Sequence, residues 1–173
     1  RPLMLMVEPT NLCNLSCPLC PSGNGEMTRP RGNMALDHFK KVFDQMADDL
    51  LLCLLWNQGE PFLNPNLIEM IRHAAGHNVP TVTSTNVHYI RNATEAEEII
   101  QSGLSELILC LDGLDPETYV KYRVGGDFDR VIKGIEQVTE AKRRLNASTP
   151  RIHLQFILMR QNEDQVEAAR QMA

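Results

Sequence analysis

Three cysteines stand close together near the start of the chain. Cys13, Cys17 and Cys20 form a C-x3-C-x2-C run in a segment with neither helical nor strand periodicity. Structural zinc sites usually take four ligands from two C-x2–4-C pairs, and bacterial ferredoxins use a C-x2-C-x2-C run with a further cysteine ahead of a proline. The run matches neither pattern. Three thiolates on a cubane [4Fe-4S] cluster would leave one iron open, which predicts a place for a substrate or cofactor ligand.

The two other cysteines, Cys53 and Cys110, lie inside apolar runs. A free cysteine in such a run behaves as a small buried hydrophobe, so we expect both in the core. Five cysteines, three of them within eight positions, are a poor disulfide framework and indicate a reducing compartment. We therefore expect a cytoplasmic protein whose cysteine loop binds metal.

The chain alternates short apolar runs with helical patterns. Alternation of this kind predicts an α/β fold, a parallel sheet with right-handed crossover helices, either as an open doubly wound sheet or as a barrel. In both, chemistry lies at the carboxyl ends of the strands. We expect strands at 3–7, 50–56, 79–85, 106–111 and 151–159, and helices at 36–47, 66–75, 94–102, 127–145 and 163–173.

Length and composition limit the other classes. A full eight-fold barrel takes about 250 residues, whereas this chain has 173, begins on Arg1 and ends inside a helical pattern. We therefore expect residues 1–173 to be an incomplete domain. The net charge of −5 and 5% aromatic residues disfavour nucleic acid as a partner. The longest apolar run, 50–56, is far shorter than the roughly 20 residues of a membrane span, so we expect no membrane partner.

The cysteine loop after the first expected strand resembles the motif of the radical S-adenosylmethionine (radical SAM) superfamily. Further likenesses follow the next strands. N-Q-G-E-P at 57–61 is similar to that family's G-G-E-P, S-T-N at 84–86 to its T-N-G with Val87 in place of the glycine, and C-L-D-G at 110–113 to its S-x-D-G. Y-R-V-G-G at 122–126 resembles a stretch typical of members with a C-terminal SPASM or twitch domain. The likeness spans residues 3 to about 162 and implies a partial (βα)6 TIM-like barrel, truncated here after about five βα units.

The resemblance implies an enzyme with two cofactors. Cys13, Cys17 and Cys20 would bind a [4Fe-4S] cluster, and S-adenosylmethionine would chelate the fourth iron. Reductive cleavage of S-adenosylmethionine would then give a 5′-deoxyadenosyl radical that abstracts hydrogen from a substrate. The implied partners are an electron donor of the flavodoxin or ferredoxin type and a peptide or small-molecule substrate, and the stretch at 122–126 favours a peptide or protein.

The resemblance also assigns residues to S-adenosylmethionine. Gly59 would allow close backbone approach, Glu60 would accept hydrogen bonds from the methionine ammonium, and Pro61 would fix the turn. The others are Thr85 and Asn86 for the methionine moiety or ribose, Asp112 for the ribose region, Arg123 for the carboxylate, and Asn162 at a family position near the cofactor.

The sequence departs from the family pattern at two positions, and two alternatives to the enzyme function stay open. Leu19 stands where many members carry an aromatic residue, and Cys110 stands in place of a serine. A structural zinc domain for protein interaction, with a fourth ligand from elsewhere, is one alternative, and an electron-carrier iron–sulfur domain is the other. His73 and His77 lie four residues apart but have no evident carboxylate partner in the sequence, so we expect them at the surface.

Overall fold

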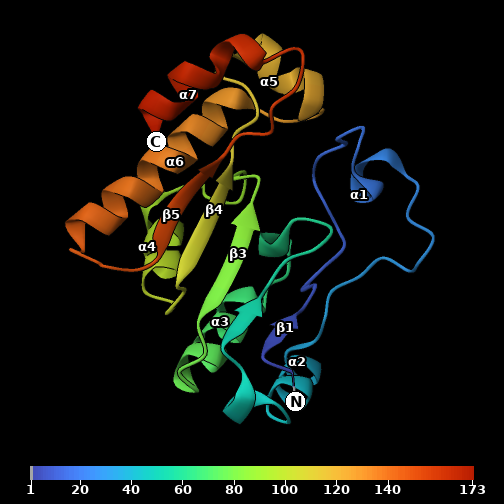
Figure 1. Cartoon of the computed structure of the whole chain (residues 1–173), viewed down its shortest axis with the longest axis vertical. Coiled ribbons are helices and arrows are strands. Elements are labelled where there is room, and N and C mark those ends of the chain that lie inside the picture. The colour runs from blue at the N-terminus through green and yellow to red at the C-terminus, as the bar shows by residue number, and fades with distance from the viewer. Residues whose placement is uncertain (1) are drawn as a thin grey trace.

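The computed structural model describes residues 2–173 and contains a five-stranded parallel sheet (Figure 1). All five expected strands are present, each shorter than or equal to its expected range. They are β1 (Met4–Met6), β2 (Leu52–Leu54), β3 (Thr81–Thr85), β4 (Glu106–Cys110) and β5 (Arg151–Gln155). The α/β prediction is confirmed.

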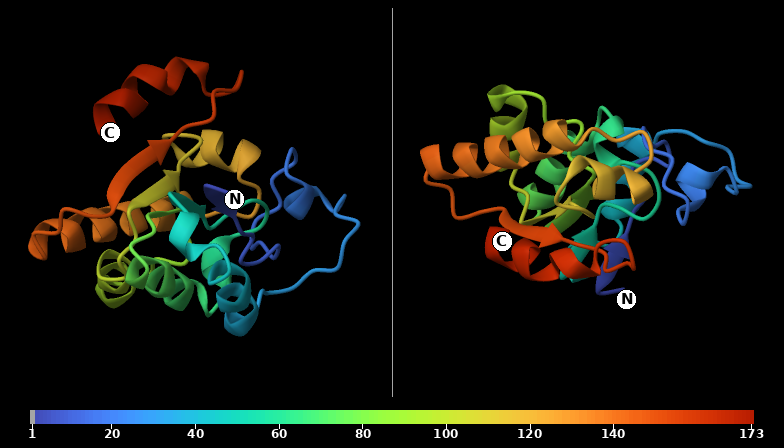
Figure 2. Two further views of the ribbon diagram at one scale, coloured as in Figure 1. Left: turned by 60° about the horizontal axis from the view of Figure 1, so that its bottom comes forward. Right: turned by 90° about the horizontal axis from the view of Figure 1, so that it is seen from above.

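The order of the strands distinguishes a barrel wall from a doubly wound sheet. Neighbours run β1-β2-β3-β4-β5 without reversal, whereas a doubly wound sheet reverses its order at a switch point. Right-handed crossovers that all run one way place their helices on one face. Figure 2 shows this outer layer, which consists of α2 (Leu36–Phe43), α3 (Leu67–Gly76), α4 (Ala93–Ile100) and α6 (Phe128–Arg144). The sheet is therefore the wall of a partial TIM-like barrel.

The core lies between the sheet and this helical layer. Helix α6 shows how the sequence builds it, because its buried positions, Val131, Gly134, Val138 and Ala141, recur at steps of three or four residues. Phe39 and Phe43 of α2 and Leu107 and Leu109 of β4 are likewise almost fully buried. Among residues 2–173, no helix combines the length and apolar character that crossing a bilayer requires.

Close packing brings α6 against the loop after β3. Val87 has a φ of +73°, a left-handed conformation that is unfavourable for a β-branched residue. A Cβ atom added at Gly134 would lie 2.6 Å from Val87 Cγ1. Glycine is therefore required at 134 because Val87 fills the space that a side chain would take.

The main differences from the sequence expectation are two short helices, the end of the fifth strand and the form of the last helix. Helices α1 (Pro21–Asn24) and α5 (Pro116–Tyr122) were not expected, although Asp115 Oδ1 accepts from Thr118 N at 2.8 Å in an ordinary N-cap. Strand β5 ends at Gln155 instead of 159, because Ile157 N donates to Asp112 Oδ1 at 2.7 Å. That hydrogen bond turns the chain out of the sheet ladder. The expected helix at 163–173 is a 3-10 turn (Glu163–Gln165) followed by α7 (Val166–Met172).

Candidate functional site

The predicted cysteine site is a cavity of about 260 Å³ at the carboxyl ends of the strands. We call it the cysteine cavity. It gathers eight of the residues expected to hold cofactors together with residues that were not expected. Its lining consists of Cys13, Leu15, Cys17, Cys20, Gly23, Trp56, Asn57, Gly59, Glu60, Ser84, Thr85, Asn86, Cys110, Tyr122, Arg123, Gln155 and Ile157.

Backbone hydrogen bonds and α1 shape the cysteine loop. Cys20 N donates to Cys17 O at 3.1 Å, and Ser16 N donates to Val124 O at 2.9 Å, which ties the loop to the segment after α5. A Cβ atom at Gly23 would lie 2.5 Å from Cys17 N. The loop therefore folds back on itself only because residue 23 is glycine.

The cysteine thiols have unequal surroundings. Burial raises the pKa of Cys13, and the Leu15 N–H, 3.4 Å from its sulfur, opposes this. Burial also raises the pKa of Cys17, while the Arg123 guanidinium, with Nη1 3.9 Å from the sulfur, lowers it. Metal binding would have to supply the remaining stabilisation of the thiolates.

The spacing of the three sulfur atoms bears on the kind of metal centre. Cys13, Cys17 and Cys20 all lie in the described part of the chain, yet their sulfur atoms do not all fall within 4.8 Å of one another. A single tetrahedral zinc ion, with Zn–S distances of about 2.3 Å, would hold its sulfur ligands about 3.8 Å apart. In a cubane cluster each thiolate binds a different iron, so a cluster does not require the three sulfur atoms to lie as close together as a single zinc ion does.

The Glu60 carboxylate is buried at the floor of the cavity. Its Oε1 accepts from Thr85 Oγ1 at 2.8 Å and from Phe62 N at 3.3 Å, and its Oε2 accepts from Asn86 N at 2.7 Å. Burial raises the pKa of Glu60 to about 7, and these three hydrogen bonds oppose that rise. A carboxylate has about four acceptor positions, so one remains for a ligand.

Glycine precedes this carboxylate for a steric reason. Gly59 has a φ of +80°, and a Cβ atom there would lie 2.6 Å from Thr10 O and 2.7 Å from Leu12 O. Pro61 is buried as the first residue of a 3-10 turn and does not line the cavity. Gly59 and Pro61 therefore position Glu60.

Asn86 links the third strand to the cysteine loop. Its Nδ2 donates to Asn14 Oδ1 at 2.9 Å and lies 3.9 Å from Cys13 Sγ. Thr85 Oγ1 accepts from Val87 N at 2.9 Å while donating to Glu60. Both residues line the cavity, so the structure brings them together with the three cysteines.

Asp112 and Asn162 lie behind the cavity wall. Asp112 has no exposed side-chain surface and holds Arg123, with 2.6 Å between Arg123 Nε and Asp112 Oδ2. Asn162, also fully buried, donates to Asp112 O at 3.1 Å and Ile157 O at 2.9 Å. Neither lines the cavity. In this structure both residues position neighbouring groups.

Arg123 itself reaches the cavity as a fixed cation. Burial lowers the pKa of Arg123, but the negative charge of Asp112 and its hydrogen bond to the guanidinium act against burial, and the pKa is raised. The guanidinium also lies 5.5 Å from the centre of the Tyr122 ring. These contacts orient a permanently charged group beside the sulfur of Cys17.

Several residues beside the cavity were given no role by the sequence. Cys20 Sγ lies 3.5 Å from Gln58 Oε1, and Gln58 N donates to Glu8 Oε2 at 3.0 Å. Glu8 also pairs with Arg29, whose Nη2 lies 2.6 Å from Oε2. Glu8 follows the first strand and Gln155 ends the fifth, so the position of a polar residue at a strand end was the available signal.

The positions of the two other cysteines agree with the expectation that they belong to the core. Both Cys53 and Cys110 are buried, and burial raises the pKa of each to about 12. Cys110 also touches the cysteine cavity. At neutral pH both therefore remain thiols in the absence of metal.

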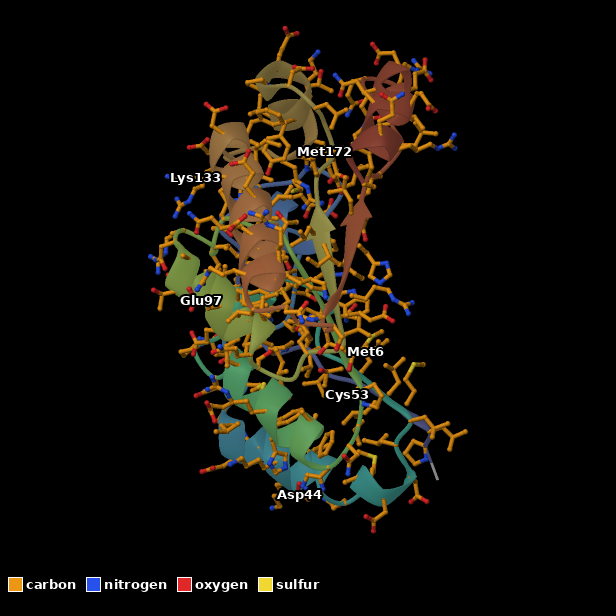
Figure 3. The ribbon with its side chains drawn as sticks, turned by 90° about the vertical axis from the view of Figure 1, so that its left-hand side faces the viewer. Met6, Asp44, Cys53, Glu97, Lys133 and Met172 are labelled. Atoms are coloured by element: carbon orange, nitrogen blue, oxygen red, sulfur yellow. The ribbon has the colours of Figure 1, made fainter. Side chains whose placement is uncertain are left out.

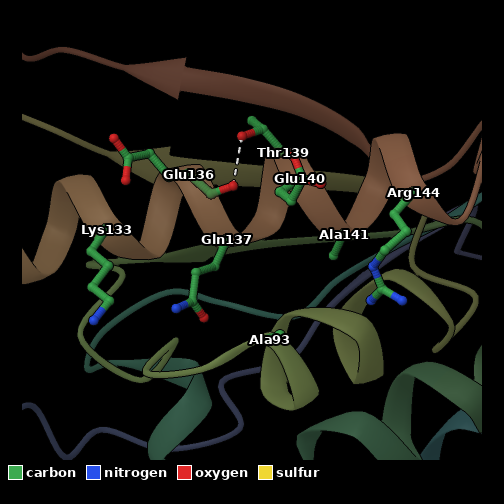
Figure 4. A pocket seen from close by; sticks show the side chains of 8 residues that line it. All are labelled: Ala93, Lys133, Glu136, Gln137, Thr139, Glu140, Ala141 and Arg144. Carbon is green, nitrogen blue, oxygen red and sulfur yellow. Dashed lines mark hydrogen bonds between the residues drawn. The ribbon is translucent and has the colours of Figure 1, made fainter.

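A larger groove lies between α4 and α6, shown in Figure 4. Its volume is about 490 Å³, and its lining includes Lys133, Glu140 and Arg144. It shares no lining residue with the cysteine cavity and contains no residue from a strand end. Because helix surfaces form it, away from the carboxyl ends of the strands, size alone does not make it the candidate site.

A barrel wall that gathers three cysteines, a buried carboxylate and a fixed guanidinium at its strand ends defines a metal-binding enzyme core. The chain belongs to the Radical SAM superfamily, whose family model matches residues 7–173. Members of this family are enzymes that bind a [4Fe-4S] cluster and S-adenosylmethionine.

Individual relatives cover most of this chain but only part of their own length. The AdoMet-dependent heme synthase of Methanosarcina barkeri is 28% identical over 141 residues, which is 81% of this chain and 40% of the relative. The mycofactocin maturase MftC of Mycolicibacterium smegmatis is 26% identical over 167 residues, which is 96% of this chain and 40% of the relative. The structure of Streptococcus suis SuiB bound to precursor peptide SuiA matches with a TM-score of 0.76 and 19% identity. The match covers 96% of this chain and 35% of the SuiB chain. The chain thus spans about 40% of the length of these curated relatives.

Proposed function

We propose that this chain is the cofactor-binding core of a radical SAM enzyme that cleaves S-adenosylmethionine reductively. The observation that carries the proposal is the convergence of Cys13, Cys17 and Cys20 with Glu60 and Arg123 in one cavity. The relatives extend well beyond the matched region. We therefore also propose that residues 1–173 are the core domain of a longer cytoplasmic protein.

The residues of the cavity divide the work of binding. The three cysteines would hold the cluster, and Glu60, with one acceptor position unused, would take the ammonium group of S-adenosylmethionine. Arg123, fixed by Asp112, would take the carboxylate. When bound, the two cofactors supply one electron and a sulfonium, whose cleavage gives methionine and a 5′-deoxyadenosyl radical.

The supporting protein groups would act by positioning. Asn86 couples the cysteine loop to Glu60, because its backbone N–H binds the carboxylate and its side chain binds Asn14. Asp112 and Asn162 hold the segment after β5 and the Arg123 side chain in place. Thr85 fixes the Glu60 carboxylate from the third strand. A ligand at the cavity would then meet an arrangement that is already formed.

The experiment is anaerobic reconstitution with iron and sulfide, followed by reduction with dithionite in the presence of S-adenosylmethionine. We expect about four irons and four acid-labile sulfides per chain and formation of 5′-deoxyadenosine. Bound zinc without acid-labile sulfide would instead identify a structural zinc domain. A redox-active cluster whose spectrum ignores S-adenosylmethionine would identify an electron carrier. Either result contradicts the proposal.

The finer proposal is that the radical acts on a peptide or protein, with a flavodoxin or ferredoxin as electron donor. The stretch at 122–126 supports it, since it resembles members with a SPASM or twitch domain, and so does the likeness to SuiB, whose structure holds a precursor peptide. The test is transfer of deuterium from labelled peptides into 5′-deoxyadenosine by the full-length protein. Transfer only from small metabolites would contradict it.

A further inference from the structure

A second group of metal-ligating side chains lies between α2 and α3. Asp44 follows the last residue of α2, while His73 and His77 lie at the end of α3. His73 Nε2 is 2.6 Å and His77 Nε2 is 3.8 Å from Asp44 Oδ1. One ligand atom from each residue lies within 4.8 Å of the other two. The carboxylate partner that the sequence did not show is therefore present, 29 residues before His73.

The packing of α2 against α3 orients the two imidazoles. Their spacing of four residues puts them on one face of the helix, and their rings lie 4.9 Å apart. The Phe43 ring lies 5.5 Å from the His73 ring and 5.6 Å from the His77 ring. The side chains of Asp44, His73 and His77 keep 51%, 19% and 41% of their surface exposed. The group is thus both ordered by aromatic contacts and open to solvent.

This group lies apart from the cysteine cavity. Helices of the outer layer run opposite to the strands, so the carboxyl ends of α2 and α3 lie at the amino ends of the strands. Figure 3 labels Asp44 at one end of the molecule, beyond Cys53 of β2. None of the three residues lines the cysteine cavity. A metal ion here would therefore be independent of the cluster.

We propose that Asp44, His73 and His77 form a binding site for a divalent transition-metal ion of the zinc class. Two imidazoles select such ions over magnesium or calcium, which prefer oxygen ligands. Zinc–ligand distances of about 2.0 to 2.2 Å place tetrahedral ligand atoms roughly 3.4 Å apart. The observed separations of 2.6 and 3.8 Å bracket that value. Three protein ligands leave the fourth position to water.

Binding requires only local rearrangement. The ion replaces the contact between His73 Nε2 and Asp44, so the neutral imidazole carries its proton on Nδ1. Coordination would widen the separation between His73 and Asp44 by roughly 0.8 Å and narrow that between His77 and Asp44 by roughly 0.4 Å. The His77 and Asp44 side chains are exposed enough to move that far. The bound ion joins the end of α2 to the end of α3. It therefore stabilises the folded chain by mass action.

The competing explanation is a simple hydrogen bond between His73 and Asp44 at two helix ends. The experiment must separate the two and must also remove the cysteine loop as a competing zinc site. It uses the full chain carrying Cys13→Ser, Cys17→Ser and Cys20→Ser, titrated with Co²⁺ and Zn²⁺ near neutral pH. Cobalt d–d bands report coordination number, and zinc is measured by calorimetry.

We expect one saturable equivalent of metal and cobalt bands of a four- or five-coordinate site. His77→Gln, at a half-exposed position, should lower the affinity at least about 10-fold, whereas the matched change His38→Gln on exposed α2 surface should leave it unchanged. Asp44→Asn gives a second, independent loss. Zinc retained by the reconstituted wild-type protein, and lost in His77→Gln, checks the same site beside the cluster.

Three results overturn the proposal. One is the absence of saturable binding below about 1 mM metal. Another is equal affinity in His77→Gln and His38→Gln. The third is a purely six-coordinate cobalt spectrum that none of the variants changes. A negative result for the Asp44, His73 and His77 site does not contradict the proposed cluster at the cysteines, because the iron and sulfide content of the wild-type protein is measured separately.

Discussion

The free energy of unfolding should change with pH because the buried Glu60 side chain ionises at a different pH in the folded and unfolded chain. Burial raises its pKa to about 7 from the ordinary 4.5. Between these pH values the unfolded chain releases the proton while the folded chain holds it. The contribution to stability is thus fully present below about pH 4.5 and is lost as the pH rises through about 7. At about 1.36 kcal/mol per pH unit the loss is about 3 kcal/mol, of which about 2.5 kcal/mol falls between pH 5 and pH 8.

Glu60→Gln removes this titration while keeping the side-chain shape. Its one carbonyl oxygen cannot serve both Asn86 N on one side and Phe62 N with Thr85 Oγ1 on the other. An unsatisfied buried donor costs about 1 to 3 kcal/mol, so the variant should be less stable than the wild type at pH 5. At pH 8 the difference should shrink by about 2.5 kcal/mol.

The assay is urea unfolding of the cluster-free chain at both pH values. Glu167→Gln, at a side chain that is 72% exposed on α7, is the matched control and should show no such change. The difference in the free energy of unfolding between wild type and Glu60→Gln should shrink or change sign from pH 5 to pH 8. Parallel pH profiles for the two proteins would refute the reasoning, because they would show that Glu60 ionises alike in the folded and unfolded chain.

Three further outcomes follow from the site and its supports. Cys17→Ala should abolish the reconstituted cluster, whereas Cys110→Ala should keep its iron. The iron content per chain measures both outcomes, and loss of iron in Cys110→Ala would identify Cys110 as a fourth ligand. In the reconstituted protein, Glu60→Gln should weaken S-adenosylmethionine binding by about one to two decades, since a charge-assisted hydrogen bond is worth roughly 1.5 to 3 kcal/mol; calorimetry with unchanged affinity would contradict this. Gly134→Ala should destabilise by about 1 to 3 kcal/mol through overlap with Val87 Cγ1, despite better helix propensity. Adding Val87→Gly should recover part of that loss in urea unfolding, and a stabilising Gly134→Ala would contradict the steric account.

The sequence predicted the sheet because its strands are short apolar runs between polar loops. It overextended β5 to residue 159, because Leu158 continues the apolar alternation although it is 64% exposed. Only a tertiary contact, from Ile157 N to Asp112, ends the strand. Helix α5 could have been predicted from Asp115 and the proline that follows, a common helix start.

The candidate site was predictable where one strand end carries the whole motif. The spacing of Cys13, Cys17 and Cys20 indicated a metal site, and the resemblance of the segment after the second strand to a family motif indicated Glu60. The sequence did not show which side chains from distant segments would pair with one another at the site. Asp112 stands in a recognisable motif, but its pairing with Arg123 makes it a buried support.

The contact between Val87 and Gly134 has a consequence for how the sequence can diverge. Position 134 cannot take a side chain while Val87 stays, because that side chain would occupy the volume of the valine. Glycine at 87 would relieve the left-handed backbone and remove the shortest of these contacts, leaving a Cβ atom at 134 with Ile90 O at 3.1 Å and Val87 O at 3.2 Å. The two positions should therefore change as a pair, with residue 87 first. Relatives whose third-strand motif ends in glycine should be the ones that carry a side chain at the position matching 134.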